Sequence, residues 1–421
     1  MNKHTEINLF DFLNCLSDVM DWLSPALTSH HLQVTLLSFR IAEQLGWSRD
    51  GLNDLVMAAM LHDVGALSLS QRMETLTFED QTGQGHAVTG AALLSQFEPL
   101  SRAAEIVRFH HVPWNGGEGM VHGPEKVPLG SHILHLADRV SLLIDRNAEV
   151  LGQADSILSK IQNRVGSMFH PELAEILFKL AVNEYFWLDL TSPLLRKVLA
   201  RASRLGTIVL NNEELLSFAN IFRRIIDFRS PFTATHSSGV AASAECLGRL
   251  TGLSADECLR IRIAGYLHDL GKLAIPTEII EKKGSLTAEE YNVMRSHTFC
   301  TYRTLEQIDG LQDINRIGSF HHERLDGSGY PFHLTENQIE TAARIMAVAD
   351  VFTALTEDRP YRPGMPSEKV LAILLDHAAN NKLDRKLVET VRQNYASMDT
   401  ARSEAQSASV LEYRAFLEKV G

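Results

Sequence analysis

The fold of this chain is best derived from residues 321–331, which read His321-His322-Glu323-Arg324-Leu325-Asp326-Gly327-Ser328-Gly329-Tyr330-Pro331. Two adjacent imidazoles run directly into an acidic, glycine-rich turn that a proline closes. Gly327, Gly329 and Pro331 favour a backbone that is neither helix nor strand. The stretch therefore predicts a site for metal and phosphate.

The surroundings of this stretch occur twice in the chain. The first matches share an offset of 206 residues, and the register resumes after a five-residue shift. The matching pairs are His30 with His236, His62 with His268, Asp63 with Asp269, His86 with His297, His110 with His321, His111 with His322, and Asp138 with Asp350. A long, regular self-match indicates a duplicated domain. We therefore expect two domains, residues 1–205 and residues 206–421, and 421 residues suffice for two hydrophobic cores.

Most of the sequence has apolar residues at three- and four-residue spacing, which predicts amphipathic helices and an all-α fold. Glycine and proline clusters separate the helical segments. In the first half these segments are 9–24, 32–46, 52–64, 86–97, 101–111 and 131–145, and 151–205 is also helical in pattern. The tail from about residue 397 has no counterpart in the first half. We expect it to form a short exposed helix that serves packing or a homodimer contact.

The composition narrows the class of protein. A net charge of −12 argues against binding of a nucleic-acid polymer, which requires clustered Lys and Arg. The four cysteines, Cys15, Cys246, Cys258 and Cys300, form no close pair, so neither a disulfide framework nor a thiolate zinc site is expected. No apolar run approaches the roughly 18 residues that span a bilayer. We therefore expect a cytosolic protein without a membrane segment.

The repeated residues of the second half form a candidate ligand set without thiolates: His236, His268, Asp269, His297, His321, His322 and Asp350. A mixture of imidazoles and carboxylates suits iron or manganese better than structural zinc. Since seven ligands are too many for one ion, we expect two divalent ions. Paired ions can activate water and clamp the oxygens of a phosphodiester. A single helical histidine is more often an ordinary packed residue, but coincidence does not explain a set that recurs in both halves.

Two further groups follow the ligands. Lys272 lies one helical turn after Asp269 and could stabilise charge on a phosphate oxygen, although an ordinary solvated lysine would look the same. Arg359, Tyr361 and Arg362 supply cations and an aromatic ring that suit phosphate and base recognition, and an ordinary surface loop is the alternative.

Together these residues resemble the HD-GYP family of cyclic dinucleotide phosphodiesterases, a branch of the HD phosphohydrolases. The resemblance extends from His236 to the arginines after Asp350, and its pairs are His268-Asp269 and Gly329-Tyr330-Pro331. It implies a helical bundle, iron or manganese, and a cyclic di-GMP or cyclic GMP-AMP substrate. By this resemblance Asp269 and Lys272 are catalytic, Lys272 contacts the scissile phosphate, and Gly329, Tyr330, Pro331, Arg359 and Arg362 hold the nucleotide.

Three positions depart from the family pattern. Phe232 replaces a glutamate that helps some members to bind a third metal, which favours a two-metal site. Thr301 replaces a usual glycine, and Lys282-Lys283-Gly284 lacks the usual proline. These two changes bear on the fit of the substrate more than on metal binding.

The first half keeps the predicted ligands His30, His62, Asp63, His86, His110, His111 and Asp138. It has Ala66 in place of the lysine, Trp114 in an altered turn, and Arg139 after the last aspartate. We expect a degenerate HD-type domain with a structural or regulatory role. Tandem HD domains with a degenerate first copy resemble phosphodiesterases that act on cyclic GMP-AMP.

The primary hypothesis is hydrolysis of one phosphodiester of a 3′,5′-cyclic dinucleotide, which yields a linear 5′-phosphorylated dinucleotide in bacterial second-messenger signalling. Two alternatives stay open. The chain could be a receptor that binds the cyclic dinucleotide without cutting it, or an HD hydrolase of ordinary nucleotides. The sequence does not decide between guanine and adenine.

Overall fold

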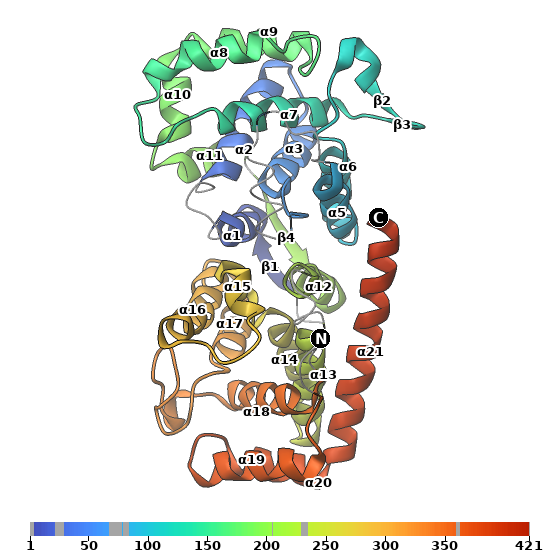
Figure 1. Ribbon diagram of the computed structural model, residues 1–421, viewed down its shortest axis with the longest axis vertical. Coiled ribbons are helices and arrows are strands. Elements are labelled where there is room, and N and C mark those ends of the chain that lie inside the picture. The colour runs from blue at the N-terminus through green and yellow to red at the C-terminus, as the bar shows by residue number, and fades with distance from the viewer. Residues whose placement is uncertain are drawn as a thin grey trace. The chain divides into compact units, whose positions relative to one another are not determined.

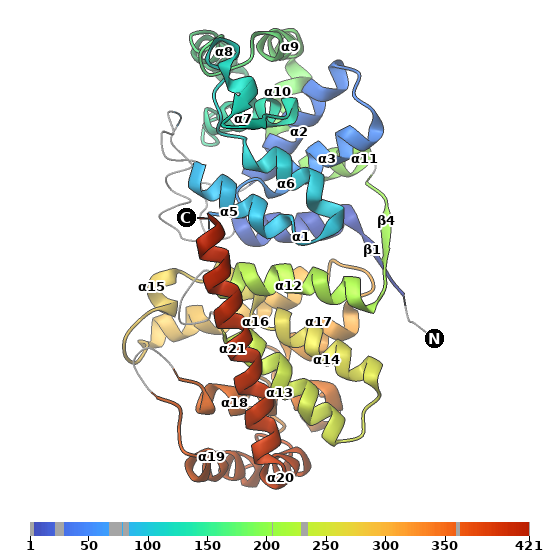
Figure 2. The same cartoon turned by 90° about the vertical axis from the view of Figure 1, so that its right-hand side faces the viewer.

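The computed structural model describes residues 4–21, 29–66, 78, 84–203, 205–228, 235–358 and 363–420. It forms two compact units (Figures 1 and 2). The N-terminal unit contains Asn8–Thr207 and Val420–Gly421, and the C-terminal unit contains Met1–Ile7 and Ile208–Lys419. Arg359, Tyr361, Arg362 and Phe232 lie outside the described residues.

The N-terminal unit is built from helices, and those that carry the repeated histidines lie at its centre. Its α-helices are α1 (Leu9–Asp21), α2 (His30–Gln44), α3 (Arg49–Leu61), α5 (Gln84–Leu94), α6 (Ser101–Arg108), α7 (Leu129–Leu142), α8 (Ala154–Gln162), α9 (Pro171–Ala181), α10 (Glu184–Thr191) and α11 (Leu195–Ser203). Short 3₁₀ turns are η2 (Glu98–Leu100), η3 (Asn115–Met120) and η4 (Leu151–Gln153). The predicted helical segments are thus confirmed within the described residues, with ends that differ by a few residues, whereas residues 22–24 and 204 of the predicted segments lie outside them.

The C-terminal unit repeats the central helices of this arrangement. Its α-helices are α12 (Asn212–Phe228), α13 (His236–Leu250), α14 (Ala255–Leu267), α15 (Thr277–Ile280), α16 (Ala288–Leu305), α17 (Gln312–Ser319), α18 (Thr341–Thr356), α19 (Ser367–Ala379), α20 (Arg385–Gln393) and α21 (Tyr395–Val420). Its 3₁₀ turns are η5 (Leu270–Ala274) and η6 (Glu336–Gln338).

Strands are few among the described residues. β1 (Thr5–Asn8) pairs with β4 (Thr207–Leu210), where the chain passes between its units. β2 (Val121–His122) pairs antiparallel with β3 (Glu125–Lys126). The all-α class is therefore confirmed.

The duplication is visible in the helices themselves. α2 and α13 are equivalent, as are α3 and α14, at the 206-residue offset seen in the sequence. The equivalent helices α3 and α14 begin in the same way, because the side chains of Ser48 and Ser254 accept a backbone hydrogen bond from the residue three positions later. The equivalent residues also reach the core, where Val34 and Val240 are both fully buried.

The tail differs from its prediction. α21 contains 26 residues, longer than any other helix in the described part of the chain, and one of its faces is buried. Gln406 and Ser409 lie within this buried face, and Arg223 of α12 donates to Ser409 Oγ at 2.9 Å. The prediction of a short exposed helix is wrong, because tertiary contacts that sequence periodicity does not reveal dock α21 onto the C-terminal unit. Across the described segments, no helix is long and apolar enough to cross a membrane.

Candidate metal centre

Five helices bring the seven candidate ligands of the C-terminal unit together. His236 begins α13, His268 and Asp269 directly follow α14, His297 lies within α16, His321 and His322 follow α17, and Asp350 lies within α18. Six of these side chains are buried and His322 is half-buried. The ligand atoms gather in three overlapping groups: His297 with His321 and His322, His236 with His268 and Asp350, and His268 with Asp269 and His321.

Asp269 is the central carboxylate of the cluster, because its two oxygens face different imidazoles. Oδ1 lies 3.5 Å from His297 Nε2, whereas Oδ2 lies 3.2 Å from His268 Nε2 and 3.9 Å from His236 Nε2. A carboxylate in this arrangement can bridge two cations.

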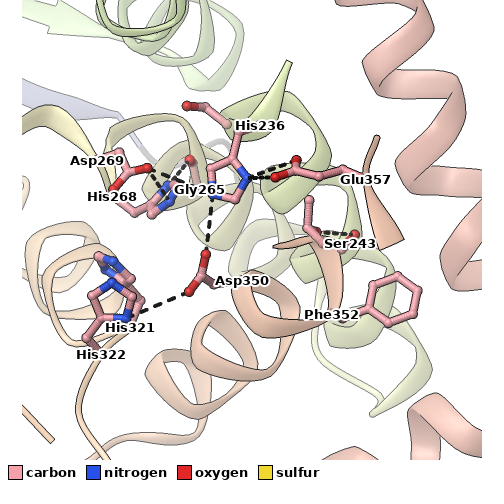
Figure 3. A network of polar contacts seen from close by, with 12 residues as sticks. His236, Ser243, Gly265, His268, Asp269, His321, His322, Asp350, Phe352 and Glu357 are labelled. Carbon is pink, nitrogen blue, oxygen red and sulfur yellow. Dashed lines mark hydrogen bonds and ion pairs between the residues drawn. The ribbon is translucent and has the colours of Figure 1, made fainter. Parts of the chain in front are cut away.

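Asp350 closes the opposite side of the cluster. Its Oδ1 lies 3.3 Å from His236 Nε2 and its Oδ2 lies 3.8 Å from His322 Nδ1 (Figure 3). Asp350 and Asp269 therefore contact His236 from two directions and supply two negative charges to a buried site.

Backbone carbonyls orient the imidazoles. The Nδ1 atoms of His268, His297 and His321 lie 2.7, 2.6 and 2.6 Å from the carbonyl oxygens of Gly265, Met294 and Gly318. Since a carbonyl only accepts, each Nδ1 donates and each Nε2 keeps a lone pair directed at the cluster. Burial lowers the pKa of His297 to about 4 and that of His321 to about 3, so both rings are neutral.

The donor set fits divalent metal ions. His268 Nε2 is buried and has no hydrogen-bond partner among the described residues, and a metal ion would satisfy it. Neutral imidazoles together with carboxylates are donors that divalent metal ions take in proteins.

Glu357 is a member of the site that the sequence analysis missed. Its carboxylate oxygens lie 3.1 and 3.2 Å from His236 Nδ1, so His236 Nε2 faces Asp350 (Figure 3). Gln406 of α21 donates to Glu357 Oε2 at 3.1 Å. The seven-residue spacing of Asp350 and Glu357, two helical turns, was a signal that could have found it.

Lys272 lies beside the cluster in η5. Its Nζ atom is 2.6 Å from Asp269 Oδ2, and its side chain is 21% exposed. The turn that carries it packs tightly, because a Cβ atom on Gly271 would lie 1.9 Å from the backbone oxygen of His297. Lys272 thus combines contact with the cluster and access to solvent.

The signature turn, which contains Gly329, Tyr330 and Pro331, borders the cluster through Tyr330. The Tyr330 ring is centred 5.0 Å from that of His322, and the Arg295 guanidinium lies 4.8 Å from the Tyr330 ring centre. Arg295 on α16 was not singled out from the sequence, since nothing in its local pattern distinguishes it from a surface arginine.

Buried Glu323 holds the turn in place. Its carboxylate accepts hydrogen bonds from the backbone nitrogens of Phe332 at 2.7 Å and Leu334 at 2.9 Å. Gly329 packs so closely that a Cβ atom would lie 2.3 Å from the nitrogen of Arg324. The histidine pair and the turn are therefore one continuous structural unit.

The two departures from the family pattern that fall within the described residues have local roles. The buried Thr301 hydroxyl accepts from the nitrogen of Gly271 at 2.9 Å and donates to the oxygen of His268 at 3.1 Å. Thr301 therefore links the turn that follows His268 to α16. Lys282 pairs with Glu290 near the start of α16, at 2.5 Å.

The comparisons with known proteins agree with this architecture. Two family models described as HD domain match residues 27–143 and 220–387. The chain is 28% identical over 94% of its length to the 3'3'-cGAMP-specific phosphodiesterase 1 of Vibrio cholerae, and the match covers 93% of that protein. It is 36% identical over 44% of its length to the cyclic di-GMP phosphodiesterase response regulator RpfG of Xanthomonas campestris, of which half is covered.

A solved structure shows the same fold over most of the chain. It is that of a cyclic GMP-AMP-specific phosphodiesterase of V. cholerae, with a TM-score of 0.62 and 24% identity. The match covers 93% of this chain and 98% of the other. The resemblance drawn from the sequence is confirmed: the chain belongs to the HD-domain family, with two HD domains in tandem, and its homologues are cyclic dinucleotide phosphodiesterases.

Proposed function

We propose that the C-terminal HD domain hydrolyses one phosphodiester of a 3′,5′-cyclic dinucleotide and releases a linear 5′-phosphorylated dinucleotide. The observation that carries the proposal is the arrangement around Asp269, whose two oxygens face different imidazoles beside Lys272. A pair of divalent ions supplies Lewis acidity and a nucleophile that is available at neutral pH. Iron and manganese suit these donors best.

Each residue of the site has a proposed task. The two ions would be held by His236, His268, Asp269, His297, His321, His322 and Asp350. Lys272 would place its ammonium group on a phosphate oxygen and stabilise charge as the bond to the leaving oxygen breaks. Tyr330, next to His322 and Arg295, would hold the nucleotide together with Gly329, Pro331, Arg359 and Arg362.

For the substrate we propose 3′,3′-cyclic GMP-AMP ahead of cyclic di-GMP. The support is that the V. cholerae relative that matches almost the whole chain is a 3'3'-cGAMP-specific phosphodiesterase, whereas the cyclic di-GMP relative RpfG matches less than half of it. A signalling role in bacteria and a homodimer remain predictions from the sequence.

The test is hydrolysis of both cyclic dinucleotides by protein prepared without oxygen and loaded with Mn²⁺ or Fe²⁺. We expect a linear dinucleotide product, with cyclic GMP-AMP turned over faster. Asp269→Ala should abolish turnover and lower the metal content, and Lys272→Ala should reduce turnover while the metal content stays unchanged. Asp63→Ala, the equivalent change in the N-terminal unit, is the matched control and should retain activity.

The same assay separates the alternatives. A receptor would return the cyclic dinucleotide intact even in a single turnover with metal present. A hydrolase of ordinary nucleotides would cleave linear nucleotides faster than cyclic ones. Unchanged turnover in Asp269→Ala would contradict the proposed site.

A further inference from the structure

The N-terminal unit contains a compact group of four candidate ligands from α3, α5 and α6 and the turns after them. The group is Asp63, His86, His110 and His111, whose ligand atoms all lie within 4.8 Å of one another. His86 Nε2 lies 3.3 Å from Asp63 Oδ1, 3.4 Å from His110 Nε2 and 2.9 Å from His111 Nε2. All four side chains are buried.

The protons of these imidazoles cannot satisfy every close contact. His110 Nδ1 lies 2.6 Å from the carbonyl oxygen of Val107, so its proton is on Nδ1 and its Nε2 presents a lone pair. His86 Nε2 faces this lone pair and, at the same time, Asp63 Oδ1 and His111 Nε2. Three ring nitrogens and a carboxylate oxygen that converge in a buried space match the donors that a single divalent ion requires.

The second group of candidate ligands in this unit, His30, His62 and Asp63, has a different chemistry, because Asp138 beside it is joined to an arginine. Asp138 Oδ1 lies 3.2 Å from His30 Nε2, whereas Oδ2 accepts from Arg139 Nη2 at 2.5 Å and from Arg139 Nε at 3.0 Å. Arg139 is only 1% exposed. Its guanidinium is thus a permanent positive charge within the site.

The C-terminal unit has no such charge at the equivalent position. There Val351 follows Asp350, and Asp350 Oδ2 faces His322 instead of a guanidinium. A dication beside Asp138 would share its carboxylate with Arg139 and meet like-charge repulsion in a buried environment.

We propose that the N-terminal unit binds one divalent metal ion through Asp63, His86, His110 and His111, and that Arg139 excludes a second ion at Asp138. The ion joins the end of α3 to the start of α5 and the end of α6, so it stabilises this unit rather than catalysing a reaction. Ala66, where the C-terminal unit has Lys272, agrees with this role because it supplies no cation for a phosphate. The proposal does not depend on the function proposed for the C-terminal unit.

The test measures bound metal in the full-length chain. Asp269→Ala with His321→Ala removes ligands of the C-terminal site, and the protein is then saturated with Mn²⁺, freed of excess metal and analysed by mass spectrometry. We expect about one ion per chain. Addition of His86→Ala and His110→Ala should remove it. A value near zero or near two in the first variant would overturn the proposal.

A second variant tests Arg139 directly. Arg139→Val introduces the residue type that follows Asp350 in the C-terminal unit. In the chain that also carries Asp269→Ala and His321→Ala, we expect the metal content to rise from about one to about two ions. Arg139→Met keeps the length of the side chain without its charge and serves if the valine variant unfolds. A metal content that stays at one in both folded variants would contradict the role of Arg139. The absorption spectrum of Co²⁺ bound to the Asp269→Ala, His321→Ala variant reports nitrogen ligation independently of the number of bound ions.

Discussion

Glu357 Oε2 lies 3.1 Å from His236 Nδ1, and the same oxygen accepts a hydrogen bond from Gln406 of α21. The first contact fixes the orientation of a candidate metal ligand. The second extends the connection to the C-terminal helix, which has no equivalent in the N-terminal unit. The candidate metal centre thereby connects His236 with Gln406, 170 positions later in the sequence.

The Glu357–His236 contact predicts that Glu357→Ala weakens metal binding. Without the carboxylate, the imidazole loses the partner that fixes its ring, and loss of such a partner typically lowers metal affinity about 10- to 100-fold. Competition with a chelator at neutral pH measures the change. Glu368→Ala, an exposed position at the start of α19, is the control and should leave the affinity unchanged. Equal affinities in the two variants would contradict the orienting role.

The Gln406–Glu357 contact predicts a smaller effect in the same assay. Gln406→Ala removes one hydrogen bond to the carboxylate but leaves the carboxylate beside His236, so we expect roughly a three- to tenfold loss of metal affinity. Glu404→Ala changes an exposed residue of α21 and should have no effect. If Gln406→Ala lowered only the melting temperature, α21 would support folding without acting on the metal centre.

The fold was largely predictable because the sequence patterns that determine it are local and occur in both halves of the chain. Apolar spacing located the helices, and the 206-residue offset placed equivalent ligands at equivalent helix ends, such as His62 directly after α3 and His268 directly after α14. The C-terminal tail was not predictable in this way. Gln406 and Ser409 look like ordinary polar residues until α21 docks against Glu357 and Arg223.

The candidate site was predictable as a set of residue types but not as a network. The repeated spacing of the histidines and aspartates identifies them as candidate ligands. Glu357, Glu323 and Arg295, by contrast, act through contacts that form only in the folded chain. Arg139 was noticed in the sequence, yet its ion pair with Asp138 depends on burial within α7. The residues that contact the candidate ligands are therefore the part of the site that only the structure identifies.

The buried Glu323 carboxylate predicts a variant that separates the signature turn from the metal ligands. Glu323→Ala leaves the backbone nitrogens of Phe332 and Leu334 without their acceptor, and each unsatisfied group costs about 1–3 kcal/mol. We expect faster hydrogen exchange across the turn and a higher KM for the cyclic dinucleotide, while the metal content remains unchanged. Glu336→Ala, whose side chain is 55% exposed, is the control. Loss of metal in Glu323→Ala would show that the turn also holds the histidine pair.

The N-terminal unit should lose stability in acid because it buries neutral histidines outside its ligand set. Burial lowers the pKa of His132 from 6.5 to about 4 and that of His135 from 6.5 to about 3. Between these values and 6.5 the unfolded chain binds more protons than the folded chain, so the free energy of unfolding rises with pH through this window. Above about pH 6.5 these two groups contribute no further change.

Replacement of His132 and His135 by glutamine should reduce the rise of the unfolding free energy with pH by an amount on the order of 2 kcal/mol per histidine. All four tryptophans, Trp22, Trp47, Trp114 and Trp187, belong to the first half of the chain. Their fluorescence therefore follows denaturant unfolding of the N-terminal unit in protein freed of metal by a chelator. His122→Gln changes an exposed histidine on β2 and should leave the slope as it is. If the double variant kept the full slope, protonation of other groups, such as the buried ligand histidines, would account for the acid sensitivity.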